Sequence, residues 1–191
     1  LVFPTSESAE IHSMSMEFFT YPWMELFFKE ETEKYKFSHL GGALQFLPYG
    51  VLVDHFQHEV YENPEMTPAE RKATWRKLEK MYNPQKDYSE NAFLEQGTLW
   101  YRQGHIFDTP FYYIDYTLAQ VLAFQFWKRA IIDKDENAWE DYLAICEVGG
   151  TKSFLELVKL ANLKSPFEEG SLTDVIKAID AELSAVDDSN L

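Results

Sequence analysis

One stretch of the sequence decides the fold: Asp108-Thr-Pro-Phe-Tyr-Tyr-Ile-Asp-Tyr-Thr-Leu-Ala-Gln-Val-Leu-Ala-Phe-Gln-Phe-Trp127. Asp108 or Thr109 can cap a helix, and Pro110 then lies in the first turn, where no amide donor is needed. Beyond the tyrosine hydroxyls, only four polar side chains interrupt the run that follows. A helix that is apolar on nearly every side belongs in the centre of a domain. We therefore expect a buried central helix from Pro110 to about Ile132.

Three tyrosines, Tyr112, Tyr113 and Tyr116, lie in the first turns of this expected helix, and His105 lies on the loop before them. At about 100° per residue, helical geometry places the three hydroxyls within roughly a quarter to a third of the circumference. Tyrosines are common in cores, where each hydroxyl finds a partner. A neutral phenol or a nearby histidine can also donate a hydrogen bond to the oxygen of a tetrahedral intermediate. The residues alone favour core packing and oxyanion stabilisation about equally.

The rest of the chain also has the pattern of helices. Thr67-Pro-Ala-Glu70 is a capping box with proline at the first helical position, which is a strong start signal. A first helix is expected over 5–22 and a second segment over 23–36. A third, over about 40–61, is expected to bend around Gly41-Gly42 and Pro48-Tyr-Gly50. Because no alternating strand pattern is present, we expect an all-α fold, with no internal boundary across residues 1–191.

Composition and charge narrow the class of protein. The 191 residues are 46% hydrophobic and 16% aromatic, which is typical of a globular chain with a sizeable core. A net charge of −15 argues against partners such as nucleic acid or an anionic membrane. No apolar run reaches the ~20 residues of a membrane span. The single cysteine, Cys146, is expected in the core, and with no signal peptide it favours a cytoplasmic location.

Candidate metal ligands are sparse in this sequence. Glu10 and Glu17 are two helical turns apart and share a face, so one or both carboxylates can point inward. A buried carboxylate must be paired, hydrogen-bonded or metal-bound, but solvation or bonding to a neighbouring helix is the commoner outcome. His55 and His58 share a helix face without the His-Glu-x-x-His spacing, which favours a structural role.

Several segments nevertheless resemble the oligoendopeptidase F family, zinc metallopeptidases related to thimet oligopeptidase and neurolysin. Glu10-Ile-His-Ser-Met-Ser-Met-Glu17-Phe is similar to the family segment that follows the His-Glu-x-x-His helix. The segments 48–64 and 105–120 are similar to later parts of the same family. The resemblance extends over most of the chain, so it is more specific than any one motif.

The resemblance implies the helical C-terminal part of a neurolysin-like zincin catalytic domain, which hydrolyses internal bonds of short peptides in a deep channel. Glu10 would be the third zinc ligand. The catalytic residues His105, Tyr113 and Tyr116 would bind the developing oxyanion, and Tyr112 would bind substrate. A zinc-polarised water would attack the scissile carbonyl, with the glutamate of the motif as base.

The departure from the family pattern is large. The two zinc histidines and the catalytic glutamate of the motif are absent, and the chain opens on Leu1-Val-Phe-Pro4 without a methionine. We expect a fragment that is inactive alone, because a catalytic zinc needs three protein ligands. Its open apolar face would need a partner, either the missing N-terminal part of the peptidase or a second copy. The alternative is a catalytically inactive helical scaffold that binds peptides without cutting them.

Overall fold

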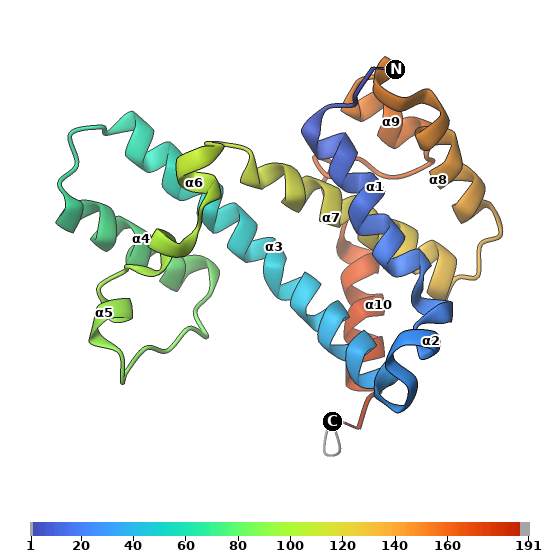
Figure 1. Cartoon of the computed structure of the whole chain (residues 1–191), viewed down its shortest axis with the longest axis horizontal. Coiled ribbons are helices and arrows are strands. Elements are labelled where there is room, and N and C mark those ends of the chain that lie inside the picture. The colour runs from blue at the N-terminus through green and yellow to red at the C-terminus, as the bar shows by residue number, and fades with distance from the viewer. Residues whose placement is uncertain (1, 188–191) are drawn as a thin grey trace. The chain divides into compact units, whose positions relative to one another are not determined.

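The computed structural model describes residues 2–187, and over this range it contains helices and no strand (Figure 1). The expectation of an all-α fold is therefore confirmed. Contacts divide the chain into two compact units: unit 1 is Leu1–Leu44 with Leu118–Leu191, and unit 2 is Gln45–Thr117. The expectation that residues 1–191 form one portion of a catalytic domain stays a prediction.

Unit 1 has a core to which four helices contribute. Its cluster of buried residues includes Ile11, Leu122, Phe126, Ile145 and Leu157, which come from α1, α7, α8 and α9. The helices of unit 1 are α1 (Ser6–Phe19), η1 (Tyr21–Trp23), α2 (Glu25–Phe28), η2 (Lys29–Glu31), the first part of α3 (Thr32–Glu62), the later part of α7 (Tyr113–Trp127), the π-helix η4 (Lys128–Ile132), α8 (Asn137–Val148), η5 (Gly149–Thr151), α9 (Phe154–Leu160) and α10 (Thr173–Ser184).

The apolar run does form the buried central helix, but α7 begins at Tyr113 and not at Pro110. Every residue from Ala119 to Trp127 is buried, as the run of apolar residues predicts. The start differs because Phe111 adopts a left-handed conformation with φ of 64°, which no helix can include. Its amide donates instead to Oε1 of the buried Gln57 at 2.8 Å. A tertiary hydrogen bond therefore overrides the local capping signal.

Unit 2 is built around its own aromatic core, formed by Leu52, Val53, Phe56, Trp75 and Trp100 together with Leu78. Its helices are α4 (Pro68–Tyr82), α5 (Ala92–Glu95), η3 (Leu99–Arg102) and α6 (His105–Asp108), with the later part of α3 and the first turn of α7. The predicted capping box starts α4: the Thr67 amide donates to Glu70 Oε2 at 2.7 Å, and the Glu70 amide donates to Thr67 Oγ1 at 3.3 Å. This local signal is confirmed.

The long helix α3 differs from expectation at its start. It runs without interruption from Thr32 to Glu62 and contains Pro48, whereas the sequence pattern placed its start near residue 40. The charged segment that opens it is supported by an ion pair between Lys36 and Glu33 at 2.9 Å, on one face of the helix. Helix-forming charged residues thus extend the helix beyond its apolar part.

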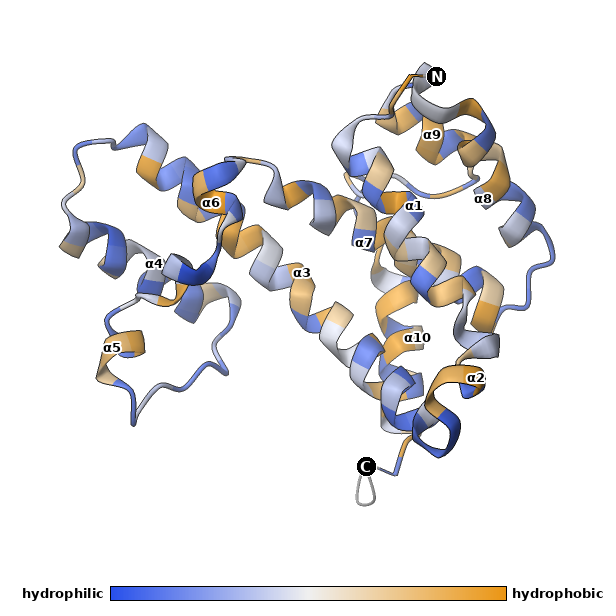
Figure 2. Ribbon diagram, viewed as in Figure 1, coloured by the Kyte–Doolittle hydropathy of each residue, from blue (hydrophilic) through white to orange (hydrophobic). Residues whose placement is uncertain are grey.

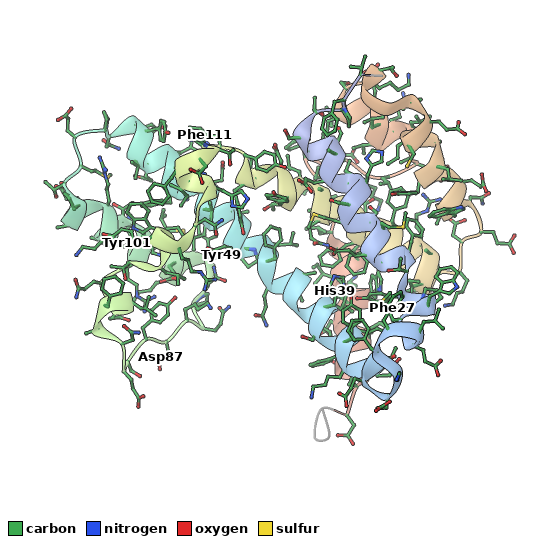
Figure 3. All side chains as sticks on the ribbon, in the orientation of Figure 1. Phe27, His39, Tyr49, Asp87, Tyr101 and Phe111 are labelled. Atoms are coloured by element: carbon green, nitrogen blue, oxygen red, sulfur yellow. The ribbon has the colours of Figure 1, made fainter. Side chains whose placement is uncertain are left out.

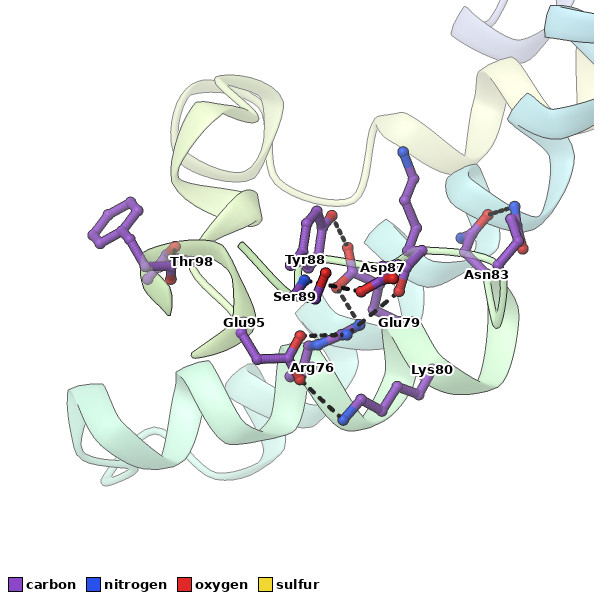
Figure 4. A network of polar contacts seen from close by, with 12 residues as sticks. Arg76, Glu79, Lys80, Asn83, Asp87, Tyr88, Ser89, Glu95 and Thr98 are labelled. Atoms are coloured by element: carbon purple, nitrogen blue, oxygen red, sulfur yellow. Dashed lines mark hydrogen bonds and ion pairs between the residues drawn. The ribbon is translucent and has the colours of Figure 1, made fainter. Parts of the chain in front are cut away.

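A polar network stabilises one side of unit 2 (Figure 4). Glu79 is 1% exposed and accepts hydrogen bonds from Arg76 Nη1 at 3.1 Å and from the Tyr88 hydroxyl at 2.9 Å. Arg76 also pairs with Glu95 at 2.7 Å, and Lys80 pairs with the same carboxylate at 3.2 Å. The buried carboxylate is therefore paired and hydrogen-bonded, and it joins α4 to the loop that follows. Arg76 and Lys80 join α4 to α5 through Glu95.

Apolar side chains on the surface of unit 1 gather at its short helix α2, which Figure 2 shows as largely hydrophobic. Leu26 is 75% exposed and Phe27, which Figure 3 labels, is 71% exposed.

The single cysteine, Cys146, is exposed on α8, so the expectation of core packing was wrong. The buried face of α8 includes Tyr142 and Ile145, and Cys146 falls one position past it. Over the range that the structure describes, no helix combines the length and the apolar character of a membrane span.

Candidate active-site residues

His105 and the three tyrosines of the predicted site lie together in unit 2. The centroid of the His105 ring is 5.0 Å from that of Tyr113, 5.6 Å from that of Tyr116 and 6.2 Å from that of Tyr112. His105 is the first residue of the short helix α6, a small departure from the expected loop. The structure therefore brings together an imidazole and three phenols, as the spacing in the sequence suggested.

The tyrosines reach His105 from the start of α7. Tyr113 and Tyr116 are in its first turn, Tyr112 directly precedes it, and all three are half-buried. Burial raises the pKa of Tyr113 to about 12, and the neighbouring Tyr49 and Tyr116 add to this rise. The Tyr113 hydroxyl therefore keeps its proton at neutral pH and remains a hydrogen-bond donor.

Hydrogen bonds hold both ring nitrogens of His105. Its Nδ1 lies 2.8 Å from Gln103 Nε2, and its Nε2 lies 3.4 Å from the Tyr116 hydroxyl. Gln103 in turn accepts a hydrogen bond of 2.9 Å from the hydroxyl of Tyr49, which Figure 3 labels on α3. Reasoning from the sequence missed both Gln103 and Tyr49. Tyr49 is separated from Gln103 by 54 residues, so no local pattern could reveal it.

The surface beside His105 is hollowed. A shallow depression of about 350 Å³ lies next to it, and most of the residues that line it are polar or charged. The lining residues are Arg102, Gln103, Gly104, His105, Asp108 and Thr109. This depression gives the imidazole a route to solvent and to small polar groups.

The candidate metal ligand Glu10 lies on α1, in unit 1. The buried face of α1 includes Ile11 and Phe18, so Glu10 and Glu17 lie away from it. Glu10 is half-buried and its Oε2 accepts a hydrogen bond from Ser13 Oγ at 2.8 Å. Glu17 is exposed and pairs with His39 Nε2 at 3.0 Å. Neither carboxylate is buried, and Glu10 as a zinc ligand stays a prediction.

The remaining histidines of unit 2 have structural partners. His55 Nδ1 lies 2.9 Å from the Tyr82 hydroxyl, and His58 Nε2 lies 3.4 Å from an oxygen of Asp54. Among residues 2–187, no three side chains of His, Cys, Asp or Glu are grouped as a metal site requires. A catalytic zinc needs three protein ligands, and Glu10 is the one candidate that the sequence suggests. The described residues alone therefore do not fit a zinc ion.

Comparisons with known proteins place this chain in a family. Residues 4–175 match the model of peptidase family M3. The structure of PZ peptidase A with an inhibitor is 61% identical in sequence to this chain, with a TM-score of 0.93. The match covers 97% of this chain and 33% of that one. A structure described as oligoendopeptidase F, from crystals grown by microfluidic seeding, is 62% identical with a TM-score of 0.94. That match covers 99% of this chain and 33% of the other.

A third structure, described as an oligoendopeptidase F from Bacillus anthracis strain Ames, is 57% identical with a TM-score of 0.82, and the match covers 99% of this chain and 30% of that one. The comparison with curated proteins returned no match. The chain spans about a third of the length of the structures it matches. It belongs to peptidase family M3, a family that uses zinc, so the resemblance seen in the sequence is confirmed.

Proposed function

We propose that this chain is part of a zinc-dependent oligoendopeptidase, which hydrolyses internal bonds of short peptides. Glu10 supplies the third zinc ligand, while His105, Tyr113 and Tyr116 bind the developing oxyanion and Tyr112 contacts the substrate. One observation carries the proposal: the imidazole of His105 lies within 5.0–6.2 Å, centroid to centroid, of three phenol rings. A packing role alone does not explain why the imidazole that these phenol rings surround also lines an open hollow.

The chemistry of these groups suits oxyanion binding. The contact of 3.4 Å between Tyr116 Oη and His105 Nε2 is long for a hydrogen bond, so a substrate oxygen can replace it. When the scissile carbon becomes tetrahedral, its oxygen gains negative charge, and fixed N–H and O–H donors stabilise that charge. Tyr112 stacks nearly parallel to the imidazole, with 10° between the ring planes, and offers a flat apolar face to the substrate.

Glu10 is proposed to bind the metal in the longer protein. Zinc, when bound, polarises a carbonyl oxygen and lowers the pKa of a water molecule. The hydrogen bond from Ser13 to Glu10 orients the carboxylate, as partners of metal ligands commonly do. The other ligands come from the portion that corresponds to the remaining two thirds of the related structures.

We also propose where the protein is located in the cell. We place it in the cytoplasm, because a chain with the single cysteine Cys146 cannot form an internal disulfide.

We also infer a protein partner for unit 1, where an apolar hollow of about 480 Å³ is lined by residues that include Met16, Phe19, Trp23 and Trp139. An exposed apolar hollow usually marks an interface. The rest of the peptidase covers it, and without that portion copies of the chain associate.

The functional test uses a chimera in which residues 1–191 replace the matching third of PZ peptidase A. The chimera, loaded with zinc, is expected to cleave an internally quenched peptide. Tyr113→Phe and Tyr116→Phe each remove one donor, so each should lower kcat by about 10²- to 10³-fold. Tyr101→Phe is the matched control, since Tyr101 belongs to the same unit but contacts Phe93 and Trp100. Equal activity of all three variants would overturn the oxyanion role.

The metal role is tested in the same chimera by zinc content after dialysis. Glu10→Gln should lower zinc retention, whereas Glu17→Gln, two turns further along the same helix, should leave it unchanged. Retention that is unaffected by Glu10→Gln contradicts the ligand assignment. A chimera that retains zinc and binds the peptide without cleaving it supports the scaffold alternative.

The partner is tested with the isolated chain. Light scattering is expected to show association, and Trp23→Lys, which places a charge on the apolar hollow, should reduce it. The control is Trp100→Phe, because Trp100 is buried in unit 2. A monomer that binds little apolar dye would contradict the inference.

A further inference from the structure

A series of hydrogen bonds supports the imidazole of His105 on its Nδ1 side. The Tyr49 hydroxyl donates to Gln103 Oε1 at 2.9 Å, and Gln103 Nε2 lies 2.8 Å from His105 Nδ1. An amide has one oxygen that accepts and one nitrogen that donates, so the direction of the first bond sets the direction of the second. With its oxygen toward Tyr49, Gln103 turns an N–H toward the histidine.

The charge of Arg102 favours this direction at the Tyr49 end of the series. Burial raises the pKa of Tyr49, and the charge and hydrogen bonding of Arg102 oppose that rise. A guanidinium carries donors and no acceptor, so its charge favours lone pairs of the Tyr49 oxygen on the side of Arg102. The Tyr49 proton points to Gln103. The hydrogen bonds therefore donate in one direction, from Tyr49 through Gln103 to the imidazole. In the reverse direction, Gln103 would present its amide oxygen to His105.

We propose that Gln103, held by Tyr49, is a positioning residue that fixes His105 as the neutral tautomer with its proton on Nε2. Because Nδ1 accepts from Gln103, the ring proton resides on the nitrogen that faces Tyr116 at 3.4 Å. This inference rests on the proposed function of His105 as an oxyanion donor. The other tautomer would present a lone pair to the developing negative charge and would repel it.

A direct test reads the tautomer in the 191-residue chain by long-range ¹H–¹⁵N correlation spectroscopy of the imidazole rings. His105→Asn identifies the signals of His105, and His55, whose Nδ1 contacts Tyr82, serves as the internal reference for a folded unit 2. In the native chain at neutral pH, Nδ1 of His105 should resonate as an unprotonated nitrogen and Nε2 as a protonated one. A protonated Nδ1 in the native chain overturns the proposal.

Gln103→Glu is the discriminating variant, because an ionised carboxylate can only accept a hydrogen bond. It should move the proton to Nδ1, so that the tautomer ratio inverts or the ring becomes an imidazolium. The matched control is Gln96→Glu, which adds the same charge to unit 2 at an exposed residue that contacts Lys72. An unprotonated Nδ1 in Gln103→Glu, or the same change in Gln96→Glu, would refute the positioning role.

A second variant covers the case in which Gln103→Glu disturbs the fold. Tyr49→Phe removes the donor that orients the amide while it keeps the aromatic ring, so the population with Nδ1 protonated should rise. A Tyr49→Phe chain whose His105 signals equal those of the native chain contradicts the inference. The readout does not depend on peptide cleavage. An inactive chimera would therefore count against the proposed function alone, and an unchanged tautomer would count against the positioning role alone.

Discussion

The loop that leads into the tyrosine helix depends on one buried glutamine, and Gln57→Leu should release it. Gln57 is 1% exposed, and its Oε1 accepts the Phe111 amide at 2.8 Å. Its Nε2 donates to the Val53 carbonyl at 3.2 Å. Phe111 adopts its left-handed conformation in this contact, with φ of 64°. Leucine has a similar volume but no acceptor, so the variant leaves the Phe111 amide without this partner.

The magnitude follows from the burial of the two groups. A buried donor left unsatisfied costs about 1–3 kcal/mol. Because Phe111 is half-buried, water can reach part of the site, and we expect the lower part of that range, about 1–2 kcal/mol. For a urea slope of about 2 kcal/mol per M, the unfolding midpoint should fall by roughly 0.5–1 M. Urea titration followed by the fluorescence of the unit 2 tryptophans measures this fall.

The matched control is Gln125→Leu in unit 1. Gln125 is 7% exposed and holds the backbone of Lys164 by two bonds, at 2.8 Å to its amide and 2.9 Å to its carbonyl. The same substitution should destabilise unit 1 by a similar amount. Only Gln57→Leu should also change the ring-current shifts of His105, because it releases the turn that holds Tyr112 against the imidazole. Unchanged His105 shifts in Gln57→Leu, or altered ones in Gln125→Leu, would refute this reasoning.

Three further substitutions test close packing and a charged cap. In Gly50→Ala, the added methyl group would collide with the Thr117 hydroxyl, so the free energy of unfolding measured by urea titration should fall by about 1–3 kcal/mol. In Gly42→Ala, the methyl group meets no neighbouring atom, so the free energy of unfolding should rise by about 0.5–1 kcal/mol. The Thr67 amide donates to Glu70 and lowers the pKa of that carboxyl, so the carboxylate stabilises the fold at neutral pH and this contribution is lost as the pH falls through the lowered pKa. Thermal unfolding should show Glu70→Gln to be less stable than the native chain at pH 7 and equal to it in acid, and a difference that persists in acid would contradict the pKa argument.

The sequence predicts those parts of the fold that local chemistry controls. The capping box before α4 and the apolar run of α7 are complete within a few residues, and the structure has both. The start of α7 could not be predicted, because the Phe111 amide bonds to Gln57, 54 residues earlier. The position of Cys146 was also missed, since one step along a helix separates the buried face of α8 from its exposed side.

In the candidate site, too, only the residues that lie close together in the sequence could be predicted. His105 and the tyrosines could be found because helical spacing and the preceding loop bring near neighbours in the sequence together. Gln103 is close to His105 in the sequence, but its role depends on Tyr49, which is 54 residues away. A hydrogen bond between residues this far apart leaves no local sequence pattern, and only the folded chain reveals it.

The most direct measurement of the central claim is zinc-dependent cleavage of a quenched peptide by this chain, alone and within the chimera with PZ peptidase A. Because the described residues of this chain contain no complete metal site, the isolated chain should not cleave the peptide at any zinc concentration. The chimera should cleave it, lose activity to a chelator and regain activity when zinc is returned. Cleavage by the isolated chain that a chelator blocks would contradict the account, as would a folded, zinc-loaded chimera that leaves the peptide intact.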